Sequence, residues 1–142
     1  MYRKKEKSRM KTLSIILFVL VVTRMIHSYD YRRAQRFYYY LTGCSTQFGK
    51  TEVSFRPDIF YCALKKDRHA FDKDGRVVLN KGLNFIWDII PKADDALKVY
   101  DIFKACYTTE YFNFDMPDVQ TIKIIKCTLL DSDMSQYFRN ID

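Results

Sequence analysis

Four cysteines constrain the fold of this 142-residue chain more than any other feature, because two disulfides would tie distant segments together. They are Cys44, Cys62, Cys106 and Cys127. They form no C-x-x-C pair, and His69 has no second histidine at a ligand spacing, so the sequence does not indicate a zinc site. Four cysteines can pair in three ways, and the sequence alone leaves all three open.

The first 28 residues have the features of a secretory signal peptide. Basic residues crowd the start of the chain, an apolar run covers 13–22, and Ser28 offers a cleavage point. The run is shorter than the roughly 20 residues that span a bilayer, so a membrane anchor is less favoured. We expect a signal peptide at 1–28 and one secreted, extracellular domain at 29–142 that does not insert into a membrane. Export to an oxidising compartment makes two disulfides the expected use of the cysteines.

Removal of the signal peptide changes the charge of the chain. Residues 1–28 contain seven of the 24 Lys/Arg and one of the 17 Asp/Glu, so the other 114 residues carry +1 instead of +7. A surface without a basic excess is not typical of nucleic-acid-binding proteins. We therefore expect no nucleic-acid partner.

Apolar residues recur at helical spacing along most of the mature chain, and strand-like alternation is nearly absent. The predicted helices cover 32–43, 57–66, 79–90, 93–107 and 117–130. Gly43 and Pro91 stand at predicted helix ends. Apolar residues nearly encircle the last helix, which predicts that it is buried on several sides at the centre of the fold. The pattern indicates an all-α, compact bundle of five or six helices.

The acid-rich segment FDKDGRV offers possible ligands for calcium. With Gly75 in the sixth position of an EF-hand loop, Asp72 and Asp74 take the third and fifth positions. The first and twelfth positions hold Ala70 and Lys81, so a cation replaces the required bidentate acid. The segment is better explained as a polar turn whose Asp side chains accept hydrogen bonds from nearby amides. We expect no metal and no other cofactor.

The same segment carries a resemblance to a known family. CALKKDRHAFDKDGRV, followed by an amphipathic helix and two further cysteines, is similar to insect odorant-binding proteins (PBP/GOBP-like) over roughly 33–130. In that family a cysteine on the third helix precedes an F-D-x-x-G turn, which Cys62, Phe71 and Gly75 match here.

Two family cysteines that pair with each other are replaced here, by Asp58 and Asp118. Loss of both partners together resembles the four-cysteine C-minus type. The resemblance then implies the disulfides Cys44–Cys62 and Cys106–Cys127, in a bundle around an internal apolar cavity.

The resemblance also implies a function in olfaction or transport: a secreted carrier that binds small hydrophobic ligands, such as odorants or pheromones, reversibly in its pocket. The mature chain is rich in aromatic residues, which would equally fill an ordinary core. From the inward faces of the predicted helices and from the tail, the expected ligand-binding residues are Leu41, Phe60, Leu64, Leu83, Trp87, Tyr100, Phe103, Tyr107, Ile122, Ile125, Leu129, Tyr137 and Phe138. His69 is a candidate pH switch near the cavity mouth, although an exposed loop histidine is the simpler interpretation.

Nothing in the mature sequence indicates an enzyme. It lacks a second histidine, a nucleophile elbow and a phosphate-binding glycine loop, so no catalytic residue is predicted. We expect a monomer or weak homodimer with a small hydrophobic ligand. The alternative is a secreted, disulfide-stabilised helical interaction protein of venom, saliva or reproductive fluid, which acts through its surface and has no real cavity.

Overall fold

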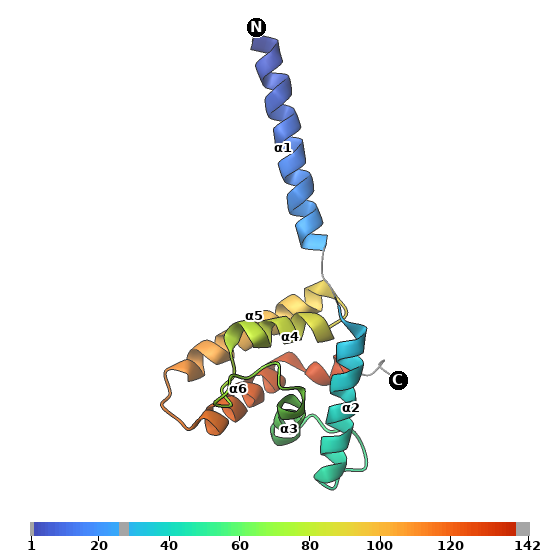
Figure 1. The fold of residues 1–142 in the computed structure, drawn as a ribbon, viewed down its shortest axis with the longest axis vertical. Coiled ribbons are helices and arrows are strands. Elements are labelled where there is room, and N and C mark those ends of the chain that lie inside the picture. The colour runs from blue at the N-terminus through green and yellow to red at the C-terminus, as the bar shows by residue number, and fades with distance from the viewer. Residues whose placement is uncertain (1, 26–28, 139–142) are drawn as a thin grey trace.

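A computed structural model describes the backbone of residues 2–25 and 29–138, and the side chains of 8–19 and 29–138 (Figure 1). The elements within these residues are α1 (Tyr2–Met25), α2 (Tyr31–Gln47), α3 (Pro57–Asp67), α4 (Leu79–Ile89), α5 (Ala93–Tyr111), α6 (Pro117–Ser132) and a short 3-10 helix, η1 (Met134–Phe138). The predicted all-α class is confirmed for this part of the chain, where the only extended pairing is an isolated bridge between Phe71 and Val77.

Helix α1 covers most of the predicted signal peptide and projects away from the other helices (Figure 1). The apolar side chains described in this helix, between residues 10 and 19, are exposed, including Leu13 and Phe18. No helix in the described residues is long and apolar enough to cross a membrane. The expected cleavage position, Ser28, lies outside the described residues, so the boundary between signal peptide and mature domain stays a prediction.

The other five helices form a closed ring. Helix α2 packs against α3 and α4, α4 against α5, α5 against α6, and α6 against α3. Phe37 on α2 is completely buried in the core, and its ring centroid lies 5.1 Å from that of Phe60, 4.8 Å from that of Phe85 and 6.0 Å from that of Phe138. The first two contacts are edge-to-face, which is a favourable geometry for aromatic pairs.

Each disulfide joins two helices that are neighbours in the sequence. Cys44–Cys62 ties α2 to α3, and Cys106–Cys127 ties α5 to α6. This is the pairing that the sequence analysis expected, and it leaves no cysteine free among the described residues. The separations are 18 and 21 residues, for which the chain-entropy model gives about 3 kcal/mol of stabilisation per disulfide.

The predicted end of α2 at Gly43 is wrong. The helix continues to Gln47, and the N–H of Phe48 donates to the carbonyl of Cys44 (3.0 Å). A glycine inside a helix costs about 1 kcal/mol relative to alanine, which is small against the burial of Cys44 and Ser45 in the following turn. The left-handed residue that follows the helix is Gly49 (φ 75°).

The prediction that α6 is buried on several sides is also wrong. Its buried residues form one face: Gln120, Thr121, Ile124, Ile125, Thr128 and Ser132. Leu130 on another face is 72% exposed. Polar residues can face the core because the hydroxyls of Thr128 and Ser132 donate to carbonyls four residues earlier in the helix.

A largely buried ion cluster joins helices α2, α3 and α4. Arg33 on α2 donates to Asp67 at the end of α3 (3.4 Å) and to Asp88 on α4. Its guanidinium also lies 5.3 Å from the centroid of the Phe85 ring, within cation–π distance. The Asp67 side chain is only 1% exposed, so its charge depends on this arginine for compensation.

Candidate functional site

The bundle contains an apolar hollow between α3, α4, α5 and α6, with a volume of about 40 Å³. Five of the predicted ligand-binding residues line it: Phe60, Leu64, Phe103, Ile125 and Leu129. Thr128 contributes a hydroxyl that is already bonded to the Ile124 carbonyl, so the hollow offers almost no polar partner to a ligand.

The hollow is much smaller than the roughly 300–1,000 Å³ of small-molecule pockets. One reason is the close approach of α4 to α5, where Phe103 lies against Gly82. A Cβ atom at Gly82 would lie only 2.5 Å from Cζ of Phe103, so only glycine allows this contact. As it stands, this hollow has no room for a molecule of odorant size.

The remaining predicted ligand-binding residues do not meet at this hollow. Leu41 and Leu83 are buried in the general core. The others are half-buried at its margin or border outer grooves: Trp87, Tyr100, Ile122 and Tyr137 in the first group, and Tyr107 and Phe138 in the second. Phe138 is itself buried against Phe37 and Phe55, so the tail folds back as far as residue 138, and residues 139–142 lie outside the described part. Ligand binding by these residues stays a prediction.

His69 lies on the surface after α3, and it is not among the residues that line the hollow. Its Nδ1 is 3.5 Å from Oδ2 of the buried Asp67, while two thirds of the histidine side chain is exposed. The location agrees with a surface loop histidine, and a role in pH sensing stays a prediction.

The acid-rich segment at 71–77 forms a polar turn. Gly75 has φ 81°, and one carboxylate oxygen of Asp72 accepts hydrogen bonds from the amides of Asp74 and Arg76, both at 2.9 Å. The turn contacts α6 because Thr121 donates to the Gly75 carbonyl at 3.2 Å. The expected local hydrogen bonds of Asp72 are thus confirmed.

A groove of about 560 Å³ lies between this turn and the connection from α5 to α6. Its walls include Arg76, Tyr107 and Gln120, and Arg76 donates to the Gln120 side-chain oxygen at 3.0 Å. Burial raises the pKa of the Tyr107 hydroxyl, and the nearby Tyr111 and Asp72 raise it further. Tyr107 therefore stays protonated and neutral at physiological pH.

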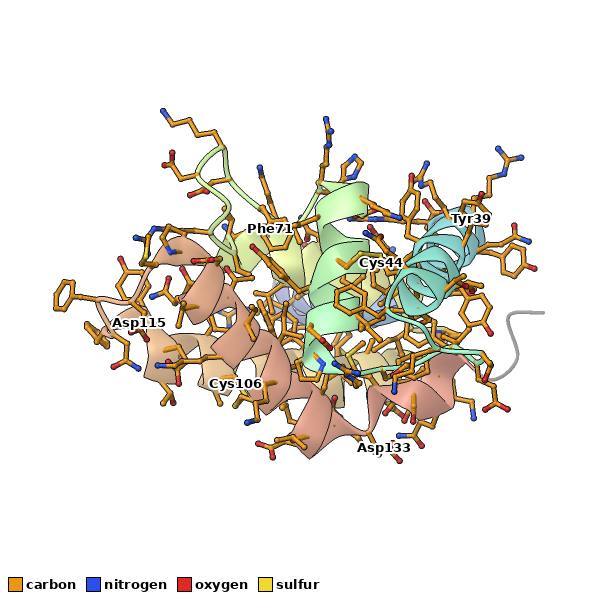
Figure 2. The ribbon with its side chains drawn as sticks, turned by 90° about the horizontal axis from the view of Figure 1, so that it is seen from below. Tyr39, Cys44, Phe71, Cys106, Asp115 and Asp133 are labelled. Carbon is orange, nitrogen blue, oxygen red and sulfur yellow. A yellow bond between two sulfur atoms is a disulfide. The ribbon has the colours of Figure 1, made fainter. Side chains whose placement is uncertain are left out.

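Exposed apolar side chains lie along and beside this groove, and the sequence analysis did not identify them as a site. We call Tyr111, Phe112, Phe114 and Met116 the aromatic tip; they are between 60% and 105% exposed. Figure 2 shows this connection, marked by Asp115, at one end of the molecule. The sequence signal was present: aromatic residues without a helical period directly before a helix-starting proline.

Comparison with known proteins places the chain in a family. The family model described as the ant venom allergen Sol i 2 family matches residues 43–131, which is more than half of the chain. This chain belongs to the ant venom allergen Sol i 2 family. Searches for matching curated proteins and matching solved structures found none.

Membership in the Sol i 2 family corrects the resemblance to odorant-binding proteins. The matched region contains Cys44, Cys62, Cys106, Cys127 and the acid-rich turn, so the features assigned to a C-minus odorant-binding protein belong to this venom family. The disulfide pairing holds although the family assignment was wrong. Venom is a secretion, so this membership agrees with the expected export of the chain and favours the venom alternative over olfaction.

Proposed function

We propose that this Sol i 2 family member is a secreted, non-enzymatic venom protein that acts through its surface. The observation that carries the proposal is the filled interior: the apolar hollow measures about 40 Å³. The family match to venom allergens supports the same conclusion. We further propose that the protein is a monomer or a weak homodimer, which sedimentation velocity would test.

The buried ion pair and the disulfides support a structural role for these charged and sulfur-containing side chains. Arg33 and Asp67 compensate each other's charge, and all four cysteines are oxidised and so cannot act as nucleophiles. The exposed His69 contacts the buried Asp67 and has no nucleophile among its described partners. We therefore include no catalytic step in the proposal.

A carrier of small hydrophobic ligands is the second candidate. It is favoured by the apolar lining of the hollow, which brings together Phe60, Leu64, Phe103, Ile125 and Leu129. Ligand entry would require the Phe103 ring to leave its contact with Gly82 and the hollow to expand several-fold. Such an expansion would separate side chains that now pack together, so the carrier needs a conformational change that the surface function does not.

An apolar fluorescent probe distinguishes the two candidates. The protein is purified from the medium of expressing cells and titrated with the probe at micromolar concentration. The variant Phe112→Ser/Phe114→Ser is titrated in parallel, because the exposed aromatic rings could bind the probe on the surface. We expect no saturable one-to-one binding in the double variant. One-to-one binding that persists in this variant and is displaced by fatty compounds would contradict the proposal and support the carrier.

A further inference from the structure

The aromatic tip differs from the rest of the mature domain because several exposed apolar side chains lie next to one another in it. Two phenylalanines, a tyrosine and a methionine lie within six consecutive residues, and Phe114 is fully exposed at 105%. Such a concentration of exposed apolar side chains marks an interaction site, because scattered single residues are the norm on soluble surfaces. Figure 2 shows that the tip lies at the opposite end of the molecule from Tyr39.

The backbone of the tip is held by hydrogen bonds. The Asn113 amide donates to the Glu110 carbonyl at 3.1 Å. The Gln120 side-chain amide donates to the carbonyls of Glu110 (2.9 Å) and Asn113 (3.2 Å), and Lys123 pairs with Asp115 at 2.6 Å. The tip is therefore a defined structure that presents its rings without first having to fold, and such pre-organisation lowers the cost of binding.

The helices behind the tip add to this rigidity. Helices α5 and α6 pack against each other, and Cys106–Cys127 links them less than two helical turns from the end of α5. The tip is thus rigidly connected to the rest of the bundle, so binding at the tip would hold the whole domain in place.

The chain segment that forms the tip carries acids and no bases, and Arg76 across the groove is bonded to Gln120, so attraction to an anionic surface is not the expected driving force. Residues 105–122 contain Glu110, Asp115 and Asp118 but no Lys or Arg. Lys123 reaches Asp115 from the next turn of α6 and neutralises one of these acids. Binding would therefore come from the apolar rings alone, without the basic residues that attract proteins to anionic lipids.

We propose that the aromatic tip anchors the mature protein in the interfacial region of zwitterionic lipid bilayers, with the rings of Phe112 and Phe114 among the lipid headgroups. Aromatic residues are enriched at this depth of a bilayer, where Tyr111 can keep its hydroxyl in water. A projecting ring needs no complementary pocket in a bilayer, whereas a protein partner would have to supply one. The inference rests on the proposed surface function and names the partner of that surface.

Flotation with vesicles tests the proposal. The protein secreted by expressing cells is mixed with phosphatidylcholine vesicles, and the fraction that floats gives the partition coefficient. We expect Phe112→Ser/Phe114→Ser to lower the partition coefficient at least about tenfold, from the loss of two rings that are only partly buried in the headgroups. Tyr39→Ser is the matched control, because it removes an exposed ring from the other end and should leave partition unchanged.

Two further measurements identify the source of binding. Addition of anionic lipid or 0.5 M salt should change the partition coefficient by less than about twofold, because the tip carries no basic excess. The variant Phe114→Trp should shift its fluorescence emission to shorter wavelength when vesicles are added, since the indole leaves water. Far-UV circular dichroism and thermal melting establish that each variant is folded.

The proposal is overturned if the wild-type protein stays unbound, or if the double variant floats as well as the wild type. Absence of vesicle binding together with weaker self-association of the double variant in sedimentation would instead make the tip a contact between copies of the chain. These outcomes leave the surface function intact, which fails only if the double variant binds an apolar probe inside the bundle.

Discussion

Two regions of the molecule, the hairpin α2–α3 closed by Cys44–Cys62 and the hairpin α5–α6 closed by Cys106–Cys127, differ in how they cover particular aromatic rings. At the Cys44–Cys62 end, Phe37 is completely buried among other rings, whereas Phe114, in the connection that Cys106–Cys127 braces, is fully exposed. The disulfide separations are similar, so the cross-links do not explain the difference.

The cause of the difference is the chain that covers each end. Helix η1 folds back over the first end and places Phe138 against Phe37 and Phe55. No segment within residues 29–138 covers Phe112 or Phe114 in the same way. Aromatic content alone therefore does not predict burial. In this molecule an aromatic ring at either end is buried only where a later segment of the chain packs over it. The covered end contributes stability, and the uncovered end is available for binding.

The largest expected effect is a difference in stability between variants that remove an aromatic ring at each end. Phe37→Ala should lower the free energy of unfolding by about 4 kcal/mol, because it removes a fully buried ring. Phe114→Ala should change it by less than about 0.5 kcal/mol, because its side chain is in water. Urea unfolding followed by circular dichroism measures both. Similar losses for the two variants would mean that the tip is packed in solution.

Arg33→Met should lower the free energy of unfolding by about 3 kcal/mol, since it leaves the buried Asp67 carboxylate without its partner. The double variant Arg33→Met/Asp67→Asn removes both charges and should recover part of that loss. Urea unfolding of the three proteins gives the comparison. A double variant less stable than Arg33→Met would show that the charge of Asp67 does not cause the loss.

Removing each disulfide separately tests whether the two cross-links differ in their effect on vesicle binding. Replacing Cys44 and Cys62 by alanine, or Cys106 and Cys127 by alanine, should cost about 3 kcal/mol in each case, because the closed loops have nearly the same length. Only the second pair should alter vesicle binding, since it supports the tip. Unfolding in urea and flotation measure the two effects. Equal loss of vesicle binding in both variants would argue against a local role for Cys106–Cys127.

The smallest effect concerns the ion pair beside the tip. The hydrogen bond with Asp115 raises the pKa of Lys123 above its ordinary value of 10.5. A raised pKa of a basic group means that its contribution to stability is present below pH 10.5 and is lost as the pH rises through the higher folded-state pKa. Lys123→Met should therefore lower the melting temperature slightly at pH 8, and this difference should shrink as the pH rises above 10.5. Lys126→Met, which removes an exposed lysine with no such pair among the described contacts, is the control. A difference between wild type and Lys123→Met that does not shrink as the pH rises above 10.5 would argue against the ion pair as its cause.

Local patterns in the sequence were sufficient for most of the fold. Helical periodicity and the prolines at 57, 91 and 117 located α3, α4, α5 and the start of α6. The prediction that α2 ends at Gly43 was wrong because the packing of Cys44 and Ser45 outweighs the low helix propensity of glycine. Side-chain hydroxyls that bond to their own helix, such as that of Thr128, let polar residues face the core, which periodicity alone does not indicate.

The site was harder to predict than the helices. The apolar faces of the predicted helices correctly indicated that Phe60, Phe103 and Ile125 lie close together. The volume left between them depends on contacts such as that of Phe103 with Gly82, which no local sequence pattern specifies. The aromatic tip was missed for the related reason that its exposure depends on where the rest of the chain lies. Motif similarity gave the correct cysteine pairing but the wrong family, so a loose motif with four cysteines was not enough to identify the family.

Both cross-links join helices that follow one another directly along the chain. During export, each thiol therefore meets its partner after only about twenty further residues have emerged, and closing so short a loop is fast. Each pair can oxidise in its own helical hairpin, before the contacts of α2 with α4 and of α3 with α6 join the two halves. The order of synthesis thereby favours the native pairing over the two alternatives.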